Sequence, residues 1–115
     1  MNAETAIQRA IMLALSDAGC IVWRNNTGQG YAGRVIHSSG GTVTLADARV
    51  IVFGLCRGSA DLIGITPDGR FLAVEVKTKT GRVSTDQQRF IAAVIAAGGR
   101  AGIARSPQDA LDIIK

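Results

Sequence analysis

GSADLIGITPDGRFLAVEVK, residues 58–77, is the stretch from which the fold is predicted. Apolar strands over 61–66 and 71–77 flank Pro67-Asp68-Gly69, which favours a tight turn, so the stretch predicts a β-hairpin. Alternate side chains of a strand point to opposite faces. One face of the second strand therefore carries three aliphatic side chains, Leu72, Val74 and Val76. The other face carries Phe71, Ala73, Glu75 and Lys77.

Two acids and a lysine are expected to meet at this hairpin. Glu75 and Lys77 share one face of the second strand, and hairpin pairing brings Asp61, at the far end of the first strand, close to Glu75. A packed core rarely holds such groups without a reason. Two neighbouring carboxylates repel each other, so one of them tends to keep its proton at neutral pH unless a divalent cation binds them both.

The sequence therefore predicts a site for metal-assisted hydrolysis of phosphodiesters, formed by Asp61, Glu75 and Lys77. Mg²⁺ prefers carboxylate oxygens and pairs naturally with phosphate, and a lysine beside it can orient an attacking water. The spacing alone leaves a structural alternative open, in which Glu75 and Lys77 form a surface ion pair and Asp61 caps a strand.

The composition is that of one folded domain over residues 1–115. Hydrophobic residues make up 47% and charged residues 19% of the chain, which suits one core. The net charge of +4 favours a polyanionic partner, whereas an aromatic content of 4% argues against stacking on single-stranded bases. We see no secretory signal and no apolar run long enough to span a membrane, so we expect a cytoplasmic protein without a membrane partner. Cys20 and Cys56 lack metal-ligand spacing and are expected to be reduced, buried and structural.

Further elements are predicted on both sides of the hairpin. The predicted helices span residues 3–18, 85–97 and 106 onward. The other predicted strands span residues 20–25, 34–38, 42–45, 50–53 and 100–105. The glycine-rich segment 25–33 predicts a loop. The order of a helix, several strands, a helix, a strand and a helix predicts an α/β sandwich around a mixed sheet.

Polar residues on the two long helices are further candidates. Glu4 and Gln8 share a stripe with apolar residues of the first helix, so Glu4 points inward or at the rim of the core, although an acid in the first turn also complements the helix dipole. Gln87 follows Ser84 at the spacing of a capping box, and the local pattern favours that structural role. His37, the single histidine, is not assigned a catalytic role.

Basic and amide side chains in loops and strand ends are candidates for contact with phosphates. Ordinary solvated loops are the alternative for each of them. The candidates are Arg24, Asn26, Arg34, Arg57, Lys79 and Arg82.

The ordered motifs resemble those of a known family. Asp61, thirteen intervening residues and then Glu75-Val76-Lys77 resemble the PD-(D/E)xK nuclease signature. The pieces G-x-x-D-L-I-G, E-V-K and G-x-x-S-x-x-Q-x-x-F, the last over 81–90, more narrowly resemble the VRR-NUC branch of that superfamily. Glu4-x-x-x-Gln8 and WRNNTG, over 23–28, are similar to its opening helix and first strand. Ala60 stands where the family often has proline, a position that supplies no ligand.

The resemblance implies a restriction-endonuclease-like α/β sandwich whose central mixed β-sheet is flanked by helices. It also implies an endonuclease that depends on Mg²⁺ or Mn²⁺, in which Asp61, Glu75 and the Val76 carbonyl hold the metal. Glu4 then completes the acidic cluster directly or through water, Lys77 positions the nucleophilic water, and Gln87 lies next to the active site. Gln8 lies behind these groups or faces DNA.

Small standalone domains of this family resemble Holliday-junction resolvases, which implies branched DNA as substrate and a bacterial or phage-infected host cell. Two symmetric cuts need two active sites, so a homodimer is expected. Two alternatives stay open: a nuclease subunit that needs a partner protein, and a non-catalytic DNA-binding protein on the same fold. Cleavage by the purified chain separates the first of these from an autonomous nuclease, and the intact acidic set argues against the second.

Overall fold

The central sheet has four strands in the order β1-β4-β5-β6, in a computed structural model that describes residues 2–115. These strands are β1 (Ile21–Arg24), β4 (Leu62–Ile65), β5 (Phe71–Val76) and β6 (Arg100–Ala104). β5 and β6 run parallel, whereas β1, β4 and β5 are antiparallel neighbours, so the sheet is mixed as predicted. The hairpin predicted from residues 61–77 is formed by β4 and β5, with Leu62 opposite Val74.

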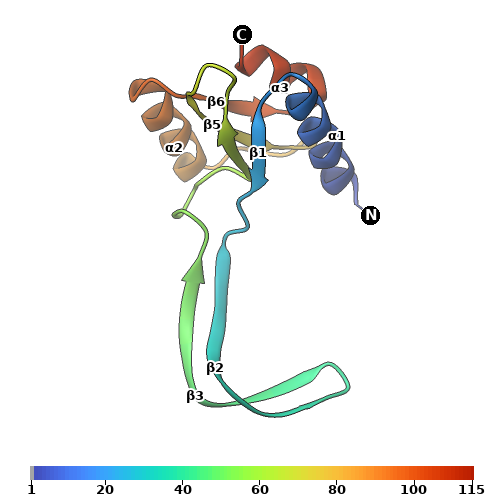
Figure 1. Cartoon of the computed structure of the whole chain (residues 1–115), viewed down its shortest axis with the longest axis vertical. Helices are drawn as coiled ribbons and strands as arrows, with labels where there is room; N and C mark the ends of the chain where they lie inside the picture. Colours follow the sequence, from blue (N-terminus) through green and yellow to red (C-terminus); the bar gives the residue numbers. More distant parts are fainter. Residues whose placement is uncertain (1) are drawn as a thin grey trace.

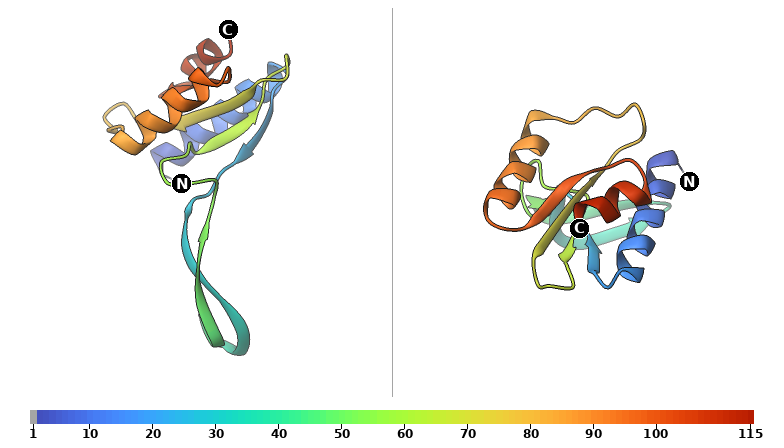
Figure 2. Two further views of the ribbon diagram at one scale, coloured as in Figure 1. Left: turned by 90° about the vertical axis from the view of Figure 1, so that its left-hand side faces the viewer. Right: turned by 90° about the horizontal axis from the view of Figure 1, so that it is seen from above.

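Three helices cover the sheet (Figures 1 and 2). They are α1 (Ala3–Asp17), α2 (Thr85–Ala96) and α3 (Pro107–Ile113). Polar side chains begin each helix: Asn2, Ser84 and Ser106 accept hydrogen bonds from backbone amides of the first turn. α1 and α3 pack together on one face of the sheet, and α2 packs on β5 and β6.

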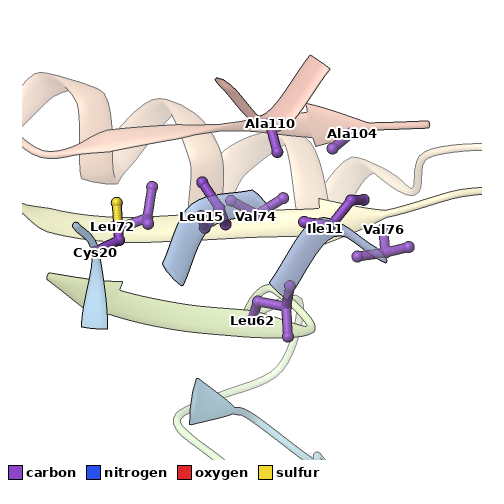
Figure 3. Packing of buried hydrophobic residues seen from close by; sticks show 9 residues of the cluster. All are labelled: Ile11, Leu15, Cys20, Leu62, Leu72, Val74, Val76, Ala104 and Ala110. Atoms are coloured by element: carbon purple, nitrogen blue, oxygen red, sulfur yellow. The ribbon is translucent and has the colours of Figure 1, made fainter. Parts of the chain in front are cut away.

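The main core lies between the sheet and the helices α1 and α3. Figure 3 shows Leu72, Val74 and Val76 of β5 facing Ile11 and Leu15 of α1, and all five are at most 1% exposed. The opposite face of β5 meets α2, where Phe71 borders a cavity together with Phe90 and Val94. The alternation predicted for this strand is therefore confirmed. Glu75 lies on the face away from the α1–α3 core.

A long two-stranded arm projects from this body (Figures 1 and 2). It consists of β2 (Gly28–Ser39) and β3 (Thr42–Phe53), which pair antiparallel in a sheet of their own. The arm gives the molecule its elongated shape, with extents of 50 × 31 × 28 Å. The first and last residues of the arm join the body, and the turn between β2 and β3 lies at the far end (Figure 2).

The extents predicted for this region are wrong. The two long strands β2 and β3 replace most of the loop predicted over 25–33 and the short strands predicted over 34–38, 42–45 and 50–53. Gly28 and Gly30 lie in β2, opposite Phe53 and Ile51. The ring of Phe53 occupies the space above Gly28, since a Cβ at Gly28 would lie 2.8 Å from that ring. Glycine is thus used here for a close cross-strand contact and not for a loop.

Three smaller expectations also differ from the structure. Cys20 is buried as expected, but Cys56 is exposed because it lies in the irregular segment that links the arm to β4. The apolar spacing of residues 85–97 predicts Ile95 on the core face of the second helix, but Ile95 is 54% exposed. The predicted second helix, over 85–97, ends one residue earlier, at Ala96. Within residues 2–115, no helix is long and apolar enough to cross a membrane.

Candidate active site

Asp61 and Glu75 meet where β4 begins and β5 ends. The register that pairs Leu62 with Val74 places the preceding residue, Asp61, beside Glu75. Asp61 Oδ2 accepts a hydrogen bond of 2.9 Å from the amide of Val76, which fixes the Asp61 carboxylate against β5. Glu75 is only 3% exposed. The hairpin therefore brings together two of the acids that the sequence identified.

The buried carboxyl group of Glu75 is left without a complete set of partners. Its Oε2 atom has no hydrogen-bond partner in the structure. Burial, followed by the hydrogen bond and the negative charge of Asp61, raises the pKa of Glu75 from 4.5 to about 8. The Lys77 ammonium opposes this shift and Glu4 adds to it. The expectation that one of two adjacent acids keeps its proton at neutral pH agrees with this raised pKa.

Lys77 continues β5 beyond the acid pair. Its amide donates to the carbonyl of Ala104 at 3.1 Å, which extends the parallel pairing with β6. Its half-buried side chain runs beside Gly81, where an added Cβ would lie 3.3 Å from the Lys77 Cδ atom. The ion pairs found among residues 2–115 do not include Glu75 with Lys77, so the structural alternative of a Glu75–Lys77 surface pair is not supported.

Glu4 and Gln8 lie on the first turns of α1. Glu4 is exposed and Gln8 is half-buried. The charge of Glu4 reaches Glu75, since it contributes to the raised pKa of that group. However, no three histidine, cysteine or acidic side chains among residues 2–115 lie close enough together to hold a metal ion. Glu4 thus stands at the rim of the acid pair rather than in contact with it.

Gln87 forms the capping box that its local pattern predicts. Its Oε1 atom accepts a hydrogen bond of 2.9 Å from the amide of Ser84, and its own amide donates to Ser84 Oγ at 3.1 Å. The side-chain oxygen is therefore engaged at the start of α2. A role for Gln87 beside the active site stays a prediction.

The loop that follows Lys77 is held by Arg105, a residue that the sequence did not single out. The guanidinium Nη1 atom of Arg105 donates to the carbonyls of Thr78, Lys79 and Gly81. The predicted phosphate ligands Lys79 and Arg82 both belong to this loop. Arg105 directly follows β6 in the chain. A prediction that β5 and β6 pair in parallel would have placed Arg105 beside the loop that follows β5.

The remaining basic candidates are dispersed. Arg24 is exposed at the end of β1 and lies opposite Leu62, the residue that follows Asp61. Arg57 is drawn toward α2 by an ion pair of 3.0 Å with Asp86. Arg34 lies within the arm, 3.9 Å from Asp47, and so is not grouped with the acid pair. Asn26 is exposed where the chain enters the arm.

Asn25, buried at the base of the arm, is a second residue whose role the sequence did not reveal. Its side-chain amide donates to Ser59 Oγ and to the Ala60 carbonyl, both at 2.8 Å, and accepts from the Leu55 amide at 3.1 Å. Its backbone amide donates to the Asp61 carbonyl at 2.8 Å. Asn25 therefore ties both ends of the arm to the backbone that carries Asp61.

Comparison with known proteins identifies the family and the fold of the chain. A family model for the VRR-NUC domain matches residues 2–108. The chain belongs to the VRR-NUC family. A solved structure described as a VRR_NUC domain is similar to this chain, with a TM-score of 0.60 and 18% sequence identity, and the match covers 99% of this chain and 96% of that chain. At this identity the match shows the VRR-NUC fold alone. No curated protein matches the chain.

The VRR-NUC match encloses both parts of the molecule. Its range, residues 2–108, includes the arm as well as the acid pair and Lys77. The family has a nuclease-type fold, and this chain keeps the mixed sheet and the three helices of that fold.

Proposed function

We propose that this VRR-NUC protein is a divalent-metal-dependent DNA endonuclease. The observation that carries the proposal is the unpartnered Oε2 atom of Glu75, buried beside the carboxylate of Asp61. A buried acid without a partner lowers the stability of a protein, and the burial and the nearby Asp61 that raise the pKa of Glu75 disfavour its charged form. A bound cation would offset this effect.

The donor set fits Mg²⁺ or Mn²⁺. Both ions prefer oxygen ligands, and Mg²⁺ in particular is often held by one or two carboxylates, retained water and a phosphate group of the substrate. Asp61 and Glu75 would supply the carboxylates and the Val76 carbonyl a neutral oxygen, with Glu4 acting from the rim through water. When bound, the ion lowers the pKa of a water molecule and screens the charge of the phosphate.

The protein's own residues would orient the reacting groups. The half-buried Lys77, whose charge acts on Glu75, would position the attacking water and offset the negative charge that develops on the scissile phosphate. Arg105 holds the loop that carries Lys79 and Arg82, and these two cations would contact DNA phosphates near the bound metal.

The preferred substrate is proposed to be branched DNA, cut by a homodimer. Contacts between basic side chains and phosphates do not read sequence, so recognition would depend on DNA structure. A four-way junction needs two symmetric cuts, and each chain carries one Asp61–Glu75–Lys77 set.

A gel assay with the purified chain tests this proposal. Labelled four-way junction, 5′ flap, linear duplex and single-stranded DNA are incubated with Mg²⁺, Mn²⁺ or EDTA. Asp61→Asn and Glu75→Ala are the inactive variants, and Asp47→Asn, which changes an exposed acid on the arm, is the matched control. We expect paired, metal-dependent nicks in the junction with wild type and Asp47→Asn only.

Other outcomes have distinct meanings. Metal-dependent cutting confined to flaps or single strands would keep the nuclease and discard the junction substrate. DNA binding without any cleavage would indicate a nuclease subunit that needs a partner protein, or a non-catalytic DNA-binding protein. Cleavage that survives both Asp61→Asn and Glu75→Ala would refute the assignment of the site.

A further inference from the structure

The arm, residues 28–53, exposes apolar side chains over most of its length. On one face near the body, Tyr31 lies opposite Val50, and Val52 is the next apolar residue on that face. Their exposed fractions are 68%, 52% and 81%. The opposite face carries Ile51 and Phe53, and the outer half of the arm adds the exposed Val35, Ile36 and Val43. Neither face of the arm packs against the helices or the four-stranded sheet (Figure 2).

Such an arm is poorly stabilised by a single copy of the chain. A two-stranded ribbon without packing on either face is marginally stable in water. Its two outer edges carry unpaired backbone groups, and a cluster of exposed apolar side chains such as Tyr31, Val50 and Val52 often marks an interaction site. A partner with matching chemistry would therefore stabilise the arm by covering it.

The charges of the arm argue against nucleic acid as the partner. Its ionic side chains are Arg34, Asp47 and Arg49, besides the single histidine, and Arg34 lies 3.9 Å from Asp47. A surface that binds DNA neutralises several phosphates with lysine and arginine. The arm instead exposes several large apolar side chains, with Val52 at 81%, which suits a protein surface of the same character.

The size of the arm suits a second copy of this chain. Twelve residues extend about 40 Å, and two strands are about 10 Å wide, so one face covers roughly 400 Å². Burying one face on each of two copies removes roughly 800 Å² from water, the size of a weak contact, and burying both faces removes roughly 1,600 Å², which is the size of a stable interface. Because a two-fold axis brings the same patch together on both copies, one apolar face can be its own partner.

We propose that the arm is a dimerisation element, and that Tyr31, Val50 and Val52 form the centre of its contact with a second copy of the chain. Asn25 ties both ends of the arm to the backbone of Asp61, so the contact also fixes the distance between the two acid pairs. This last consequence rests on the proposed nuclease function, whereas the contact itself does not.

Sedimentation equilibrium of the purified chain tests the inference. The variants are Tyr31→Lys/Val52→Lys and the milder Val50→Thr/Val52→Thr, which keeps side-chain shape and strand propensity if the lysines prevent folding. Leu13→Lys is the matched control, because Leu13 is also apolar and 64% exposed but lies on α1. Far-ultraviolet circular dichroism of each variant checks that it is folded.

We expect a wild-type dimer with a dissociation constant in the micromolar range or below. Loss of the apolar contacts should raise that constant at least about 100-fold for the lysine variant and at least about 10-fold for the threonine variant. Leu13→Lys should dimerise as wild type. A wild type that stays monomeric at about 100 µM, or a dimer that both arm variants leave unchanged, would overturn the inference.

Further outcomes separate this inference from the proposed function. Glu75→Gln should dimerise as wild type whether or not the protein cleaves DNA. A monomer that cuts DNA would refute the arm contact and leave the nuclease in place. A monomer whose affinity for duplex DNA falls with Val50→Thr/Val52→Thr would assign the arm to DNA and refute the second copy as its partner.

Discussion

Replacing Glu75 by glutamine should make the metal-free protein more stable at alkaline pH while abolishing its activity. Glutamine keeps the shape of glutamate but carries no charge, so it removes the cost of ionising a buried group. In the folded protein the pKa of Glu75 lies at about 8, against an ordinary value of 4.5. The folded state therefore holds a proton on Glu75 over a pH range in which the unfolded state has released it.

The sign and size of the effect follow from this difference. Where the folded state binds more protons than the unfolded state, the free energy of unfolding falls as the pH rises. The contribution of Glu75 is most favourable below 4.5 and is lost as the pH rises to about 8. At about 1.4 kcal/mol per pH unit, the loss between pH values of about 5 and about 8.5 reaches about 4 kcal/mol.

Urea unfolding followed by circular dichroism, in EDTA at both pH values, measures this difference. We expect wild type to lose several kcal/mol between acidic and alkaline pH, and Glu75→Gln to lose much less. Asp47→Asn is the control, because the Asp47 side chain is 89% exposed and its charge has little cost. Parallel pH profiles for wild type and Glu75→Gln would show that Glu75 is not strained and would refute the reasoning.

Three further predictions concern the surroundings of the acid pair. Lys77→Met should lower single-turnover cleavage at least about 100-fold without lowering the melting temperature, and near-wild-type cleavage would remove Lys77 from the mechanism. Arg105→Lys should cost about 1–2 kcal/mol in urea unfolding and weaken DNA binding measured by fluorescence anisotropy, because a lysine cannot reproduce the three carbonyl contacts; unchanged values in both assays would contradict this. Gly64→Ala should cost at least about 3 kcal/mol in the same unfolding assay, since its Cβ would lie 2.1 Å from the Ile21 carbonyl oxygen and separate β1 from β4. Gly30→Ala, where the nearest atom is 3.7 Å away, is the matched control, and equal costs for both would refute the steric argument.

The body of the fold was predictable because its signals are local. The alternation of residues 71–76 and the turn at Pro67-Asp68-Gly69 define the hairpin, and the hairpin register alone brings Asp61 to Glu75. The capping box of Gln87 is likewise contained within four residues. These features need no knowledge of distant contacts.

The arm and the supporting residues depend on contacts that the local sequence does not show. Gly28 predicts a loop until the ring of Phe53 is placed above it. Arg105 is linked to the loop beyond β5 only because β5 and β6 are parallel neighbours. The role of Asn25 follows from the meeting of both ends of the arm with the segment before Asp61. In each case the partners lie 24 or more residues apart in the sequence.

Proton release on metal binding is the most direct test of the central claim, that Asp61 and Glu75 form a cation site. Mn²⁺ is titrated into the metal-free protein at a pH of about 7, in two buffers with different enthalpies of ionisation, by isothermal titration calorimetry. Because the pKa of Glu75 is about 8, the expected result is release of about one proton for each bound ion, abolished in Asp61→Asn. Absence of binding up to about 10 mM Mn²⁺, or binding that releases no proton and survives Asp61→Asn, would contradict the claim.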